Sequence, residues 1–274
     1  MIKAFMEYTF LQNAVFSALL ASIICGIIGT IIIEEKLVMM SGGIAHTSFG
    51  GIGLGYFLEI EPIIGALFFS ILAAIGLITI RRKIKVNSDT LMGIFWAMGM
   101  ALGILFIAFT PGYPPDISSY LFGNILTVTS FDIKIILIFT IVLVFTISAL
   151  FNYWKAYLFD SQFSSVIGIK TKLLEYLLFI LIALAIVALI RVVGIILVIA
   201  LLTAPPAIAK LFSYDLKKMI FYAIFFSMFF SLAGLWISYQ FNISSGASIV
   251  LLAGFSYFIA VLISKRTAGL KTYS

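Results

Sequence analysis

Apolar stretches of about 20 residues recur along most of this 274-residue chain. A helix of that length spans the hydrocarbon core of a bilayer, whereas a transmembrane β-strand is about half as long and alternates apolar with polar side chains. The stretches here do not alternate with period two, and only 10% of the residues are charged, against about 25% in soluble domains. The sequence therefore predicts an all-α polytopic membrane protein.

We expect about nine transmembrane helices along the chain. They cover residues 14–33, 37–58, 63–80, 90–110, 133–151, 173–190, 192–212, 219–239 and 247–264. The break between the sixth and the seventh rests on Arg191 alone, so a tight re-entrant pair is the alternative for these two spans.

The basic residues predict how the helices are oriented. If the N-terminus is outside, only Lys3, Lys134 and Arg191 of the 17 Lys and Arg residues lie on the outer side. Cytoplasmic loops are enriched in Lys and Arg, so we expect an N-out, C-in topology. This distribution also accounts for the net charge of +6, and we expect no nucleic-acid partner.

Two connecting loops are long. The outer loop, Pro111–Asp132, contains three of the six prolines, so we expect it to begin irregularly. The inner loop, Asn152–Lys172, has apolar residues spaced by three and four, as on one face of a short amphipathic helix that a glycine ends. The residues of this predicted helix are Phe159, Asp160, Phe163, Val166, Ile167 and Gly168. It is either a docking surface or an ordinary connection.

The motifs of several enzyme classes are absent from the sequence. There is no G-x-x-x-x-G-K-[ST] motif, so we expect no ATP hydrolysis by a P-loop of this chain. No H-E-x-x-H motif, no G-x-S-x-G motif and no acidic pair occurs within a span. These features disfavour an intramembrane protease and a proton pump with a carboxylate relay.

The only histidine, His46, lies near the middle of the second apolar stretch. Six glycines surround it: Gly42, Gly43, Gly50, Gly51, Gly53 and Gly55. A polar side chain at this depth usually faces a partner or a water-filled cavity, and glycines allow close helix packing. His46 is therefore a candidate metal ligand or pathway-lining residue, since imidazole binds Zn, Cu, Fe and Ni. The alternative is a buried histidine bonded to a carbonyl of a neighbouring helix.

Six segments, in order over residues 37–264, resemble motifs of one family, the metal-transporting ABC permeases (ABC-3 family). They read MSGGIAHTSFGGIGLGYFL, SDTLMGIFWAMGMALG, SYLFGNILTVTSFDI, FDSQFSSVIGIKTKLLEYLLF, RVVGIILVIALLTAPPAIAKLFS and ISSGASIVLLAG. Each motif alone is weak, because apolar segments look alike, whereas six in the same order are specific.

The resemblance implies a membrane-spanning permease subunit of an ATP-driven importer for zinc, manganese or iron, located in the cell membrane. It implies a fold similar to that of vitamin B12 and siderophore importers, a second copy of the chain, two cytoplasmic ABC ATPase subunits and an extracytoplasmic metal-binding protein. The chain itself is then no enzyme and binds no cofactor, because ATP binds the partner. We expect one transmembrane domain over residues 1–274, with a coupling loop at about 152–172 and a cytoplasmic tail at about 265–274.

The resemblance also assigns residues. His46 matches the family's pathway histidine, and the predicted helix of the inner loop matches its contact to the ATPase. Gly42 stands where the family has an aspartate, so one hard oxygen ligand is missing, which disfavours Mn(II) and favours Zn(II). The alternatives are a permease for a metal chelate or a cobalamin-like solute, and a stand-alone secondary transporter.

Overall fold

In the computed structural model, which describes residues 8–83, 88–112, 120–121, 123 and 125–271, the regular secondary structure is helical. The long helices are α2 (Thr9–Glu34), α3 (Val38–Phe57), α4 (Pro62–Lys83), α5 (Ser88–Phe109), α7 (Ser130–Ala149), α10 (Thr171–Phe212), α11 (Leu216–Phe241) and α12 (Ser245–Lys271). Three short elements, η1 (Ile125–Thr127), α8 (Phe151–Phe159) and α9 (Ser161–Val166), lie in the connections.

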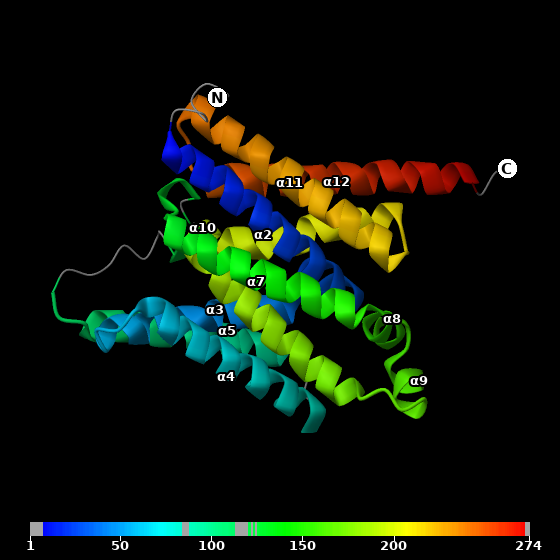
Figure 1. Ribbon diagram of the computed structural model, residues 1–274, viewed down its shortest axis with the longest axis horizontal. Helices are drawn as coiled ribbons and strands as arrows, with labels where there is room; N and C mark the ends of the chain where they lie inside the picture. The colour runs from blue at the N-terminus through cyan, green and yellow to red at the C-terminus, as the bar shows by residue number, and fades with distance from the viewer. Residues whose placement is uncertain (1–7, 84–87, 113–119, 122, 124, 272–274) are drawn as a thin grey trace.

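The 42-residue helix α10 is two helices that meet at Gly194. This glycine has φ 76° and ψ 161°, which no helical residue has, and a positive φ is readily adopted only by glycine. Figure 1 shows the first half, in yellow-green, leaving α9, and the second half, in yellow, running back to the same end of the molecule. The predicted break at Arg191 is therefore three residues early.

Ion pairs show that each half of α10 runs between the two ends of the bundle. Glu175, near the start of α10, lies 2.7 Å from Arg82 at the end of α4. Arg191, near the middle, lies 2.8 Å from Glu61, which precedes the start of α4. Lys210, near the end of α10, pairs at 3.1 Å with the last residue of α2, back at the first end. Because the start, middle and end of α10 lie at alternating ends of the bundle, α10 forms two full spans and not a re-entrant pair.

Seven of the described helices, counting α10 once, are long and apolar enough to cross a membrane. The helix α3 is not among them, because glycines and small polar residues lower its hydropathy. It lies between α4 and α5, with which it makes its main contacts. A Cβ on Gly51 would overlap the carbonyl of Gly65 in α4, and one on Gly53 would overlap Gly103 in α5. With α3 and both halves of α10, the described chain crosses nine times, as predicted.

The short helices α8 and α9 lie at the end of the bundle where α12 finishes, and α2 begins at the opposite end (Figure 1). This arrangement agrees with the predicted N-out, C-in topology. The helix α12 continues to Lys271, so the predicted tail at 265–274 begins as part of a helix. Lys3, on which the topology prediction partly rests, lies outside the described residues.

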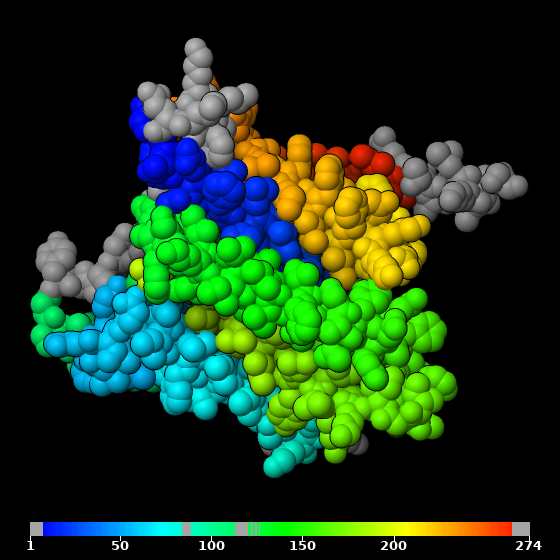
Figure 2. Space-filling view, in the orientation of Figure 1, coloured from blue at the N-terminus to red at the C-terminus, as the bar shows by residue number. Residues whose placement is uncertain are grey.

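In the face seen in Figure 2, α7, in green, crosses the middle, with α2, in blue, and α11, in orange, on one side of it and α4, in cyan, on the other. Long apolar side chains of α7 point away from the bundle, and Phe145 is 72% exposed. Such a surface is stable only against lipid or another apolar partner.

The outer loop packs against the helix break as far as it is described. A Cβ on Gly123, whose φ is +68°, would overlap the backbone of Val193 beside Gly194. Ile125 of η1 is buried. Residues 113–119, the proline-rich part of this loop, lie outside the described residues.

Candidate functional site

The candidate ligand His46 is buried at the interface between α3 and α5, with 8% of its surface exposed. Its ring stacks on the indole of Trp96 in α5, with 3.9 Å between the ring centroids and 9° between the ring planes. Its Nδ1 is buried and has no hydrogen-bond partner among the described residues. The alternative prediction, a histidine bonded to the carbonyl of a neighbouring helix, therefore does not hold for Nδ1.

Close backbone packing sets the register that brings His46 and Trp96 together. Thr47 Oγ1 lies 2.7 Å from the carbonyl oxygen of Gly43 in its own helix and 3.2 Å from that of Phe95 in α5, and it can donate to either. A Cβ on Gly99 would lie 3.0 Å from the carbonyl oxygen of His46, so a larger residue there would separate the two helices. Small residues thus hold the imidazole against the indole.

Open space borders this pair on its cytoplasmic side. Gly42 lies one turn before His46 on the same face of α3, and a Cβ there would meet no described atom within 4 Å. Gly93, three residues before Trp96 in α5, borders open space in the same way. The side chain that Gly42 lacks would therefore have room beside the imidazole.

Among the described residues, no group of three or more His, Cys, Asp and Glu side chains lies close enough to hold a metal ion. One described thioether faces Gly43, three residues before His46, since Met92 Sδ would be 3.1 Å from a Cβ on Gly43. Any further ligand for an ion at His46 must come from elsewhere, such as a second subunit, water or backbone carbonyls.

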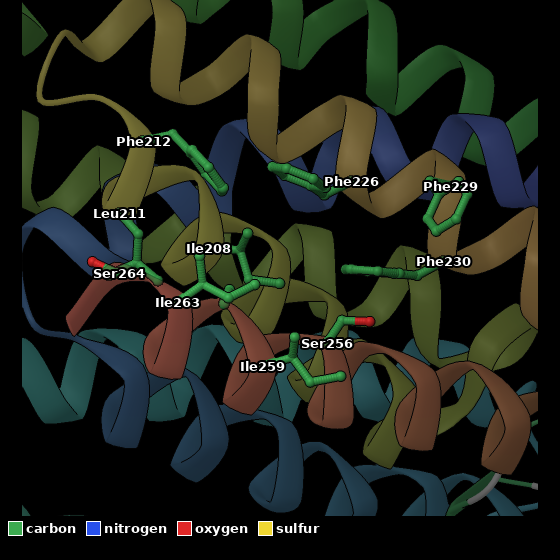
Figure 3. A pocket seen from close by; sticks show the side chains of 11 residues that line it. Ile208, Leu211, Phe212, Phe226, Phe229, Phe230, Ser256, Ile259, Ile263 and Ser264 are labelled. Atoms are coloured by element: carbon green, nitrogen blue, oxygen red, sulfur yellow. The ribbon is translucent and has the colours of Figure 1, made fainter. Parts of the chain in front are cut away.

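A separate apolar pocket of about 430 Å³ lies between α10, α11 and α12 (Figure 3). Its walls are aromatic and aliphatic side chains, among them Phe212, Phe226 and Phe230, with two serines and no histidine or carboxylate. A metal ion needs charged or imidazole donors, so this pocket is not the candidate metal site.

The inner loop forms two helices in place of the single one predicted. Phe159 ends α8, and Asp160 caps α9, where its Oδ1 accepts from the backbone N–H of Gln162 and of Phe163 at 2.9 Å each. An aspartate at this position satisfies donors that the first turn of a helix leaves free. Gly168 follows α9 with φ +88° and ends it, as predicted.

The predicted apolar residues of this loop are exposed to an unusual degree. The exposed fractions are 92% for Phe159, 60% for Phe163, 82% for Val166 and 56% for Ile167. A pocket of about 460 Å³ separates α8 and α9 from the turn between α10 and α11, where Tyr214 is 90% exposed. We call Phe159, Phe163, Val166 and Ile167 the apolar loop face.

The helix α8 connects the apolar loop face to the membrane helices. Trp154 and Tyr157 are buried against the bundle. The Tyr157 hydroxyl donates to the carboxylate of Glu35, in the turn between α2 and α3, and burial is the main cause that raises the pKa of both groups. This contact was not predicted, because only the fold brings α8 beside that turn.

At the outer end, Arg191 lies 2.8 Å from Glu61 and 3.0 Å from Asp132, at the start of α7. Asp132 also accepts from the backbone and hydroxyl of Thr129, in a capping box. The basic residue that the topology prediction placed in the outer connection between the sixth and seventh spans is therefore neutralised by carboxylates of two other segments.

These features define the class, a polytopic membrane transport subunit with a candidate ligand inside the bundle and an exposed apolar loop face at one end. The model of the ABC 3 transport family matches residues 7–264. The chain belongs to this family, as the six motifs predicted.

Relatives that match over nearly the full length of the chain support this family assignment. The chain is 40% identical over 261 residues to an uncharacterized membrane protein of Synechocystis sp., covering 95% of this chain and 92% of the relative. It is 34% identical over 265 residues to the manganese transport system membrane protein MntC of Listeria monocytogenes, covering 97% and 94%.

Two solved structures have the same fold. The first, PsaBC from Streptococcus pneumoniae in complex with Fab, superposes with TM-score 0.89 at 33% identity and covers 100% of this chain and 98% of that one. The second is described as a metal-chelate type ABC transporter in an inward-facing conformation, with TM-score 0.74 at 14% identity over 95% and 88%. It supports the predicted fold alone.

The chain is thus the multi-pass membrane permease subunit of an ABC importer of the metal-transporting family. This assignment confirms the predicted class over the stand-alone secondary transporter. The family match makes it the membrane subunit and not the ATPase, and a permease of this kind works with an ATPase and a binding protein.

Proposed function

We propose that this chain carries divalent metal ions across the membrane by alternating access and that His46 is a ligand on their path. The observation that carries the proposal is the buried imidazole at the middle of α3, whose Nδ1 has no partner among the described residues. A buried polar atom left without a bond costs free energy, so its presence calls for an explanation such as a functional role. The open space at Gly42 and Gly93 gives an ion room beside it.

Two copies of the chain form the complete transporter in this proposal, with two copies of a cytoplasmic ATPase. ATP binds that partner, and this chain supplies no resident cofactor. The apolar loop face seats on the ATPase, because exposed phenylalanines at the cytoplasmic end need an apolar partner. A binding protein delivers the ion at the outer end.

The cargo is an ion that accepts nitrogen ligands, with Zn(II) preferred over Mn(II). Relatives include proteins described as manganese transport system membrane proteins, which supports the divalent class. However, Gly42 removes the carboxylate that their family places one turn from the histidine, and Mn(II) prefers oxygen ligands. A metal chelate or a cobalamin-like solute is the alternative cargo, and it would not need His46.

The proposal is tested by uptake of Zn(II) and Mn(II) into vesicles that contain the complete transporter. His46→Ala is expected to abolish most uptake while the ATPase still co-purifies. Ser48→Ala is the matched control, because Ser48 is buried in the same helix and its hydroxyl donates to the carbonyl of Ala45 in that helix. Equal uptake by the two variants would remove His46 from the path, and chelate uptake by His46→Ala would support the alternative cargo.

A further inference from the structure

His46 lacks the support that a metal-binding histidine normally has. A ligating imidazole almost always donates its second N–H to a carboxylate, a carbonyl or water, which fixes the orientation of the ring. An ion on Nε2 would leave Nδ1 as that second nitrogen, and Nδ1 is buried with no described protein group within hydrogen-bond reach. If His46 binds the cargo, as proposed above, another group must orient the ring.

The indole of Trp96 supplies this constraint through its face. At 3.9 Å between centroids and 9° between planes, the two rings are in parallel contact. Rotation of the imidazole about its Cβ–Cγ bond would therefore make the ring collide with the indole. The stack covers a face of the imidazole and not its edge, and metal ions bind ring nitrogens at the edge, in the plane of the ring. We infer that Trp96 is the positioning residue of the metal path, holding His46 by stacking in place of the usual hydrogen bond.

Packing alone does not explain this tryptophan. Trp96 remains 40% exposed, whereas Trp154, which does fill the core, is fully buried. His46 covers one face of the indole, and much of the remaining Trp96 side chain is exposed. Replacing it with an aliphatic residue should therefore affect the imidazole more than the stability of the bundle.

Stacking also favours the loaded state. A bound divalent ion withdraws electrons from the imidazole, and the face of an indole attracts a positively charged group more than any other aromatic ring does. Such a contact is worth about 0.5–2 kcal/mol, so its loss should raise the KM for the ion roughly 2- to 30-fold. The change is expected in KM and not in kcat, because the stack acts on binding of the ion and not on the ATPase.

The first test compares uptake by complete transporters reconstituted in vesicles, with Zn(II) and with Mn(II). Trp96→Leu is expected to raise KM within that range with little change in kcat, and Trp96→Phe to recover part of the loss. Trp236→Leu is the matched control, since Trp236 lies on α11, 52% exposed and far along the chain from the site. Equal KM values for Trp96→Leu and Trp236→Leu would overturn the inference while the proposed function stands.

The second test needs no transport. Co(II), which quenches indole emission at short range, is added to the detergent-solubilised transporter. Quenching is expected in the wild type and is expected to be lost both in Trp96→Phe and in His46→Ala. If quenching persists in Trp96→Phe, the indole is not beside the bound ion and the inference is wrong. If His46→Ala changes neither quenching nor uptake, the proposed function fails together with it.

Discussion

One substitution, Gly→Ala, should have opposite effects at two positions of α3. At Gly51 the added Cβ would overlap the carbonyl of Gly65 in α4, and the third-nearest atom, Ala66 Cα, would be only 2.8 Å away. All three neighbours are backbone, so the helices must separate. Overpacking usually costs about 1–3 kcal/mol, and a backbone clash belongs at the upper end. At Gly42 no described atom lies within 4 Å, so the same methyl group adds no clash and gains about 0.5–1 kcal/mol of helix propensity.

The assay uses the single cysteine as a reporter. Cys25 is fully buried in α2, so a thiol-reactive dye should label it only on unfolding. At about 2–4 °C per kcal/mol for chains of comparable size, Gly51→Ala should lower the labelling midpoint by roughly 6–12 °C. Gly42→Ala should leave it unchanged or slightly higher. Equal midpoints for the two variants would refute the close crossing of α3 and α4.

Three further predictions concern cargo, docking and topology. Gly42→Asp should shift competitive uptake toward Mn(II), because it places a carboxylate one turn from the pathway histidine, and an unchanged ion profile would show that position 42 does not face the cargo. Phe163→Ala should reduce co-purification of the ATPase, since a buried aromatic anchor contributes about 2–4 kcal/mol, whereas Phe145→Ala on the outer face of α7 should not; equal loss would contradict the docking assignment. In a cysteine-free background, an impermeant reagent should label Ile60→Cys and not Tyr214→Cys in intact cells, and the reverse pattern would invert the topology.

The number of spans could be predicted from the sequence, because bilayer thickness sets the length of each apolar stretch, and the basic residues on one side carry the prediction of their orientation. The break inside α10 was placed wrongly for a physical reason. Arg191 looked like a loop residue, yet Glu61 and Asp132 neutralise it at the end of a helix. The reversal itself occurs at Gly194, a residue that an apolar helix also tolerates, so its positive φ leaves no local signal.

The structure of the inner loop was likewise predicted only in part. Its apolar spacing and Gly168 correctly predicted helical structure and its end, since both signals are local. Asp160, expected inside one helix, instead caps the second of two, because its short carboxylate binds the backbone of the following turn. The anchoring of α8 by Tyr157 on Glu35 depends on residues more than one hundred positions apart, which no local pattern indicates.

The same reasoning explains why His46 could be identified from the sequence and Trp96 could not. A lone histidine among glycines departs from the composition of a membrane helix, whereas a tryptophan in an apolar stretch does not. Their contact depends on the register between α3 and α5, which is set where Gly50 and Gly99 let the two backbones approach. A shift of one helical turn, about 5.4 Å along either axis, would leave His46 in place and remove the stack. The proposed metal path therefore depends as much on the glycines that align the helices as on the proposed ligand, His46.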